Sequence, residues 1–407
     1  MPESTNFFKN RIFLVSFVSV IIIGILAGGV FYYNSKQKDT KSDSKSSTKV
    51  KPPNKIEAKI KNKEITYASW IPDWGTDSGL ESLKQNTKVI DSISPVWYEA
   101  NKNGELVNKT PKNSQEMLDY ASNNQIEIIP SIACFDHEIL TEILQNQTNL
   151  DKHVDSILKT VLDNNYDGID IDYESTKLSD KDKFFEFLEK LSGKLKTNQK
   201  KLSIAVLAKW GDDVIYPGLK ETRAVQDWSK IAPLVDEIRI MTYDYTGGGS
   251  LYPGPIGPLN WQEDVIKYAL TKAPKEKYVL GVHLYGYEQW VEVKNPSQDK
   301  KFGDPKLKFT PDFKNQTSGE EPMRSYTYQT VQRILKDYPG TTDNYQGEKI
   351  YSYSKTNDDT GILENRVLVY IDPEGIQARK DLAKKYGLQG IAFWRVGADG
   401  DLLKGLK

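Results

Sequence analysis

Residues 166–174 carry four acidic side chains at a spacing that could do acid–base chemistry. From residue 169 on, the pattern has the two-residue period of a β-strand. Ile169, Ile171 and Tyr173 share one parity, and Asp170, Asp172 and Glu174 share the other. Like charges on one strand face repel each other, so at least one of these carboxyl groups should have a raised pKa. A carboxyl group that keeps its proton near neutral pH is suited to general acid catalysis.

Two other uses of such a stretch have to be weighed. Alternating acids occur on the solvated face of an edge strand, although edge strands favour lysine and short lengths. Alternate acids also begin an EF-hand calcium loop, which needs glycine at its sixth position. Counting from Asp170, that position holds Ser175, so the required turn is missing. The pattern alone therefore leaves catalysis and a solvated strand face as alternatives.

Composition excludes several classes of function. The 407-residue chain has a net charge of −1, which gives no electrostatic footprint for nucleic acid. Its single cysteine, Cys134, rules out an internal disulfide and a cysteine zinc cluster, and lies in an apolar run typical of a core. The three histidines lack the spacing of a zinc-binding helix. We therefore expect no metal and no cofactor, and no obligate protein partner is evident.

The N-terminus has the pattern of a membrane anchor. Residues 12–33 form an apolar run without a charge, long enough to span a bilayer, and Lys9 and Arg11 precede it. The run is longer than a usual secretory signal, so we predict an uncleaved signal anchor after a cytoplasmic segment, residues 1–11. The alternative is cleavage near residues 27–29, which would release a secreted protein.

The segment after the apolar run predicts a disordered linker at residues 34–63. It is rich in Lys, Ser, Asp and Thr and contains Pro52-Pro53. These lysines would by themselves favour the opposite orientation, but long C-terminal domains translocate largely regardless of such charge. We place the domain outside the cell membrane, held by a single span. This placement rests on the function inferred below and not on the charges.

Residues 64–407 alternate between strand-like and helical patterns. Strands are predicted at 66–71, 89–97, 127–133, 166–174, 202–208, 237–243, 278–283 and 390–394. Helices are predicted at 79–85, 113–123, 150–164, 179–195, 261–272 and 374–386. Eight near-continuous apolar strands separated by helices predict an α/β fold, a parallel (β/α)8 or TIM barrel. Residues 286–366 break this rhythm and predict a small α+β insertion between the seventh strand and the last helix.

In such a barrel the active site lies at the carboxyl ends of the strands. Asp170, Asp172 and Glu174 would climb the fourth strand toward that face, with Glu174 at its edge. This position favours catalysis over a solvated strand face.

Three strand ends carry a resemblance to glycoside hydrolase family 18, the chitinase family. Asp167, Asp170, Asp172 and Glu174 match the family signature Asp-x-x-Asp-x-Asp-x-Glu. The segments Met241-Thr242-Tyr243-Asp244 and Gly390-Ile391-Ala392-Phe393-Trp394 resemble the sixth and eighth strand ends. Segments 253–258, 285–287 and 393–397 resemble the bacterial cell-wall and spore-cortex branch more than the large secreted chitinases. Members of that branch often carry LysM repeats, and none is visible here. Residues 131–134 depart from the family pattern of the third strand.

The resemblance implies a substrate-assisted mechanism that retains the anomeric configuration. Glu174 would protonate the glycosidic oxygen while the 2-acetamido group of the substrate attacks the anomeric carbon. Asp172 would orient that group, Tyr243 would donate to its carbonyl oxygen, and Asp170 would share a proton with Asp172. Asp167, on the other parity, would be structural.

The same resemblance implies a set of binding residues. Trp394 would form the floor under the cleaved sugar, and Asp244 would bind its hydroxyl groups, with Met241 beside them. Trp97 and Tyr285 are placed in the cleft only because they end strands. For these aromatic residues, a place in the core is the alternative.

The function predicted on this basis is hydrolysis of β-1,4 bonds next to N-acetylglucosamine, on peptidoglycan. Chitin, or chitooligosaccharides, is the alternative substrate, since it also carries the 2-acetamido group. A carbohydrate-binding protein without activity is the alternative class. Such relatives typically lose the terminal glutamate, which is present here as Glu174.

Overall fold

The computed structural model describes residues 64–212, 219–247, 254–291, 324–356 and 363–406. The predicted signal anchor at 12–33 and the linker at 34–63 lie outside this part. Among the helices of the described part, none combines the length and the apolar character that a membrane span requires.

Eight parallel strands close into a barrel, which confirms the fold predicted for this part of the chain. They are β1 (Thr66–Pro72), β2 (Ser92–Ala100), β5 (Ser131–Cys134), β6 (Gly168–Tyr173), β7 (Lys201–Leu207), β8 (Glu237–Met241), β9 (Tyr278–His283) and β15 (Gly390–Trp394). Neighbours in this order pair in parallel, and β15 pairs with β1 to close the ring. The predicted third strand is split, with β4 (Glu127–Ile128) ahead of β5. A short β3 (Leu106–Asn108) pairs antiparallel with β2.

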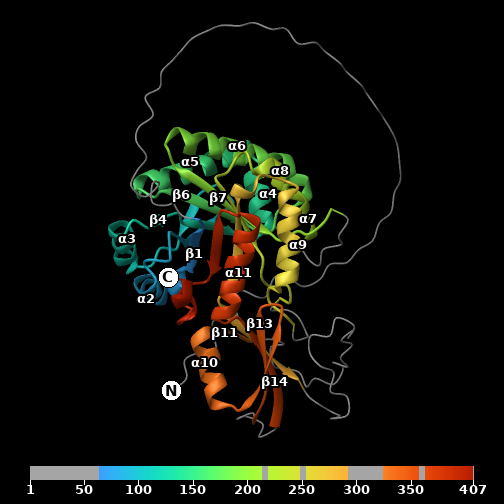
Figure 1. Ribbon diagram of the computed structural model, residues 1–407. Coiled ribbons are helices and arrows are strands. Elements are labelled where there is room, and N and C mark those ends of the chain that lie inside the picture. The colour runs from blue at the N-terminus through green and yellow to red at the C-terminus, as the bar shows by residue number, and fades with distance from the viewer. Residues whose placement is uncertain (1–63, 213–218, 248–253, 292–323, 357–362, 407) are drawn as a thin grey trace, which may run out of the picture. The chain divides into compact units, whose positions relative to one another are not determined.

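Helices surround the barrel strands (Figure 1). Those that follow the predicted segments are α2 (Thr76–Gln85), α3 (Ser114–Asn123), α5 (Gln147–Asp163), α6 (Lys181–Thr197), α9 (Leu259–Leu270) and α11 (Pro373–Tyr386). Three further helices around the described part of the barrel were not predicted, namely α4 (His137–Gln145), α7 (Lys220–Val225) and α8 (Trp228–Ile231). The sequence does hold a signal for α4, because Asp136 caps its first turn by accepting from the amides of Glu138 and Ile139.

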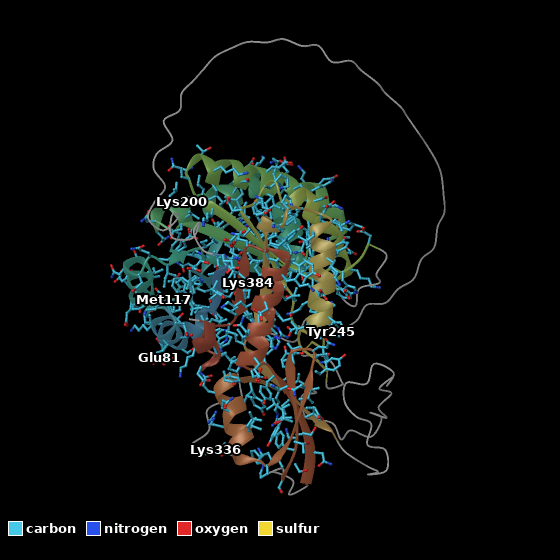
Figure 2. The ribbon with its side chains drawn as sticks, viewed as in Figure 1. Glu81, Met117, Lys200, Tyr245, Lys336 and Lys384 are labelled. Atoms are coloured by element: carbon cyan, nitrogen blue, oxygen red, sulfur yellow. The ribbon has the colours of Figure 1, made fainter. Side chains whose placement is uncertain are left out.

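Both faces of the barrel strands are buried, so apolar residues predominate along the strands. Outward-facing side chains pack under the helices, where Met117 of α3, labelled in Figure 2, is among the fully buried residues. Inward-facing side chains form a separate small cluster: Ala68, Trp70, Ala205, Val279 and Ala392, with Val96, Met241 and Trp394 against it. Small residues dominate this inner cluster, which leaves space for the inward acids of β6.

The register of the sheet places polar side chains around one of those acids. Asp170 is paired with Ser131 of β5 on one side and with Ser203 of β7 on the other. Residues paired across parallel strands point to the same face, so these serines and Asp170 all point into the barrel. Asp170 and Asp172 of β6 are therefore central and buried, not on a solvated edge.

The segment between β9 and α11 forms a five-stranded antiparallel sheet. Its strands are β10 (Tyr285–Val291), β11 (Arg324–Thr327), β12 (Gly340–Tyr345), β13 (Glu348–Thr356) and β14 (Leu363–Tyr370), in the order β11-β10-β14-β13-β12. The helix α10 (Tyr328–Asp337) packs on one face through Val331. The opposite face carries Tyr285, Ile350 and Val369, which pack with Ile256 and contact Tyr243 and Trp394. This face therefore lies against the mouth of the barrel.

Candidate active site

Asp170 lies at the bottom of the candidate site and is fully paired. Its Oδ2 accepts from Trp70 Nε1 at 2.9 Å and from Ser131 Oγ at 2.6 Å, and its Oδ1 accepts from Ser203 Oγ at 2.5 Å. Arg239 Nη1 lies 3.8 Å from Oδ1. Among the described residues no hydrogen bond joins Asp170 to Asp172, so the predicted sharing of a proton between them is not seen.

Arg239 supplies the buried positive charge beneath the acids, and sequence reasoning missed it. It is completely buried on β8, where Nε and Nη2 donate to Glu237 Oε2 at 3.0 and 2.9 Å. Its Nη1 donates to Ser94 Oγ of β2, and its guanidinium lies over the Trp70 ring, 5.8 Å from the centroid. A buried charge needs such partners. Arg239 thus balances Asp170 and Glu237.

Asp172 lies two residues further along β6, closer to the barrel mouth, and no described side chain donates a hydrogen bond to it. It is buried, and its Oδ1 has no hydrogen-bond partner. Burial, followed by the negative charges of Glu174 and Asp170, holds the pKa of Asp172 well above its ordinary value. An unpaired carboxyl oxygen facing the same side as Glu174 is prepared to accept a donor from a ligand.

Glu174 directly follows β6 and is partly exposed at the barrel mouth. Burial, with the negative charge of Asp244, raises the pKa of Glu174 to about 7, while Arg223 acts in the opposite direction. The side chain therefore keeps a proton near neutral pH and can still release it, as a general acid requires. This strand end thus places an unpaired carboxyl oxygen of Asp172 beside a carboxyl group with a raised pKa.

The helix α7 holds the backbone that carries Glu174. Thr222 Oγ1 lies within hydrogen-bond distance of the carbonyl oxygens of Glu174 and Thr176, at 3.1 and 3.2 Å, and accepts from the amide of Thr176 at 3.0 Å. Gln226 Nε2 donates to the carbonyl of Tyr173 at 3.3 Å. These contacts hold the backbone of residues 173–176 and so position the Glu174 side chain. No sequence signal pointed to Thr222 or Gln226.

Tyr243 and Asp244 lie opposite the acids, after β8. Burial and the surrounding carboxylates, Asp172 first among them, keep the pKa of Tyr243 well above its ordinary value, so its hydroxyl stays a donor. Asp244 Oδ1 accepts from the hydroxyls of Tyr285 and Tyr287, the latter at 2.7 Å. Burial nevertheless leaves the pKa of Asp244 raised. The two tyrosines of β10 thereby join the insertion to the site.

Trp394 and Met241 border the same space. Both pack against the inner cluster of the barrel, and both are partly exposed. The Trp394 ring meets the edge of Trp70, with centroids 6.3 Å apart, and Trp70 in turn donates to Asp170. The peptide bond after Trp394 is cis. The structure thus brings Trp394 and Met241 together with the acids.

The prediction that Trp97 lines the cleft is wrong. Trp97 is fully buried in the core under the helices. Side chains alternate along β2, and the neighbouring Val96 takes the inward position against the inner cluster. Tyr285, placed by the same strand-end reasoning, is buried, but its hydroxyl reaches Asp244. Asp167 lies at the barrel's other end, where its Oδ2 accepts from the amide of Ile128 at 2.8 Å.

Comparison with known proteins agrees with this geometry. The family model "Glycosyl hydrolases family 18" matches residues 29–399. The cortical fragment-lytic enzyme of Bacillus subtilis is 24% identical over 325 residues, which are 78% of this chain and 67% of that protein. The crystal structure of the spore cortex-lytic enzyme SleL of Bacillus megaterium aligns with a TM-score of 0.67 at 22% identity, covering 84% of this chain and 73% of that one.

A chitinase structure is similar to the same degree. The enzyme from Chromobacterium violaceum aligns with a TM-score of 0.67 at 17% identity, covering 84% of this chain and 99% of that one. At such identities the structural likeness establishes the fold alone. The family model, in contrast, covers most of the chain, including all the strand ends described above. The chain therefore belongs to glycosyl hydrolases family 18 and is a glycosidase.

Proposed function

We propose that this glycosidase cleaves β-1,4 bonds next to N-acetylglucosamine by substrate-assisted retaining catalysis. The observation that carries the proposal is the arrangement around Asp172. Its Oδ1 has no partner, while Glu174 beside it holds a proton with a pKa of about 7. One carboxyl group is thus free to receive a substrate amide, and the other is ready to donate a proton.

In this mechanism Glu174 transfers its proton to the glycosidic oxygen as the bond to the leaving sugar breaks. The carbonyl oxygen of the substrate's own acetamido group attacks the anomeric carbon and forms an oxazolinium ion. Asp172 Oδ1 accepts the acetamide N–H, and the Tyr243 hydroxyl donates to the acetamide oxygen. Glu174, now a carboxylate, removes a proton from the water that opens the ion, which restores the acid and retains the configuration.

Asp170 and the surrounding aromatic residues support these steps. Asp170 is held below Asp172 by three hydrogen-bond donors and by the nearby guanidinium of Arg239. Trp394 forms the floor under the sugar that carries the acetamide, and Asp244 binds its hydroxyl groups. Exposed aromatic side chains follow the same ends of three strands: Trp74 after β1, Phe135 after β5 and Tyr245 after β8. Such rings stack on sugar faces and fit a polysaccharide.

Peptidoglycan is the polymer we propose as substrate, supported by the similarity to cortical fragment-lytic and spore cortex-lytic enzymes. Chitin is the second candidate because a chitinase has the same fold. Incubating the protein with each polymer and analysing released fragments by mass spectrometry decides between them. We expect peptidoglycan fragments with N-acetylglucosamine at the new reducing end. Fragments from chitin alone would assign the protein to chitin, and binding without fragments would assign it to the carbohydrate-binding class.

The pH profile tests the assignment of Glu174 as the acid. Glu174 must be protonated, so kcat/KM should fall as the pH rises through about 7. Asp244→Asn removes a negative charge that favours the protonated form, so this falling limb should move to lower pH. Arg223→Gln removes a positive charge that favours the ionised form, so the limb should move to higher pH. Shifts of both variants in the same direction would contradict the assignment.

We further propose that residues 12–33 anchor the protein in the cell membrane with the glycosidase outside. The support is the uncharged apolar run and the position of the proposed substrate. Protease digestion of intact cells and of inverted vesicles tests this proposal. Digestion of the domain only in inverted vesicles would place it inside and overturn the orientation. Recovery of the protein in the medium would support the alternative of a cleaved signal.

A further inference from the structure

Arg395 lies at the barrel mouth and takes no part in the mechanism above. It directly follows Trp394, the last residue of β15, and its guanidinium lies over the ring of Trp74, 4.0 Å from the centroid. Trp74 follows β1, the neighbour of β15, and is 49% exposed. Trp394, the residue before Arg395, packs against Trp70, which donates to Asp170, so Arg395 follows a strand end that borders the candidate site.

The Arg395 guanidinium has no acceptor among the residues that the structure describes. Its Nη1 is buried without a hydrogen-bond partner and lies so close to Gly75 that a Cβ there would be 2.9 Å away. The nearby carboxylate of Asp399 is engaged elsewhere, by Ser82 Oγ at 2.8 Å and by the amide of Gly397 at 2.7 Å. The cation is therefore held over a ring, and the structure shows no described acceptor for its hydrogen bonds.

The Arg395 guanidinium is suited to binding an anionic ligand. Burial lowers the pKa of Arg395 to about 10, so the group is still charged at neutral pH. Leaving a partly buried charge without an acceptor costs free energy, which a bound carboxylate would recover. The planar guanidinium matches a carboxylate through two parallel hydrogen bonds, and the contact with the Trp74 ring restricts its position before a ligand binds.

We propose that Arg395, oriented by Trp74, binds the free 3-O-lactyl carboxylate of an N-acetylmuramic acid residue next to the sugar that lies over Trp394. The proposal rests on the proposed function and specifies its substrate. Chitin carries no carboxylate, so this contact would separate the two polymers. The lactyl carboxyl group is an amide wherever a peptide is attached. An amide hydrolysis that removes the peptide must therefore supply this substrate.

Three oligosaccharides of equal length test the proposal: a peptide-free glycan of alternating N-acetylglucosamine and N-acetylmuramic acid, the same glycan with its lactyl carboxyl groups converted to methylamides, and a chitooligosaccharide. The measured quantity is the ratio of kcat/KM on the free acid to kcat/KM on the methylamide. We expect the natural protein to prefer the acid, and Arg395→Gln to lower the ratio by about ten-fold to a hundred-fold. Arg395→Lys should keep part of the preference.

The control is Arg333→Gln on α10, an exposed arginine away from the mouth, which should leave the ratio unchanged. An equal loss on all three oligosaccharides in Arg395→Gln would make Arg395 structural only, and an unchanged ratio would exclude the contact; either result overturns the proposal. A binding measurement separates this proposal from the proposed function. In a Glu174→Gln background, the ratio of Kd for the methylamide to Kd for the free acid is measured with and without Arg395→Gln. If no glycan is cut but Arg395 still selects the free acid in binding, the catalytic proposal fails and the carboxylate site stands.

Discussion

Glu174→Gln should lower kcat by about 10²- to 10⁴-fold, the contribution of a positioned general acid. Glutamine has nearly the same shape but cannot release a proton to the glycosidic oxygen. Because Thr222 binds the backbone of residue 174 and not its side chain, the loop should keep its position. We therefore expect glycan affinity, measured by calorimetry, to change little while turnover is lost.

Glu189→Gln is the matched control for this substitution. Glu189 is an exposed glutamate of α6, so its replacement should leave kcat unchanged and the protein as stable as before. A Glu174→Gln variant that retains a large part of the natural rate would mean that another group donates the proton. A variant that loses both turnover and glycan affinity would instead make Glu174 a binding residue.

Arg239→Leu should destabilise the protein by about 3–5 kcal/mol, the cost of breaking a buried ion pair from one side. The substitution leaves Glu237 and Asp170 buried without their counter-charge, and Ser94 loses its donor as well. Leucine is also smaller than arginine and would leave unfilled volume beside Trp70. The free energy of unfolding from urea titration measures the effect.

The exposed Arg333→Leu of α10 is the control, for which a change within about 0.5 kcal/mol is expected. An Arg239→Leu variant that loses less than about 1 kcal/mol would show that the acids below the site do not depend on this counter-charge. The denaturant slope should be similar in both variants, since a changed slope would mean that the unfolded or native state itself differs.

The barrel could be predicted from sequence because its signals are local. Period-two alternation located the strand with Asp170, Asp172 and Glu174, and the apolar runs located the other strands within a few residues. Strand order follows from chain order in a βα repeat, so the ends of β6, β8 and β15 had to share one face. The site at that face could be predicted for the same reason.

The parts that were missed depend on contacts that are distant in sequence or on short elements. Helices α7 and α8 have six and four residues, too few for a helical period to emerge. The ion pair between Asp170 and Arg239 joins β6 to β8, and no local sequence pattern predicts it. Trp97 was misplaced because a strand-end position does not determine which face a side chain takes, and on β2 the inward position belongs to Val96.

The central claim, that the substrate's acetamido group is the nucleophile, can be tested with aryl glycosides whose N-acetyl group carries zero, one, two or three fluorines. Fluorine withdraws electrons from the carbonyl oxygen that attacks the anomeric carbon, so kcat/KM should fall steeply with each fluorine added. A rate independent of fluorination would contradict the account and would point to a carboxylate of the protein, with Asp172 as the nearest candidate, as the nucleophile.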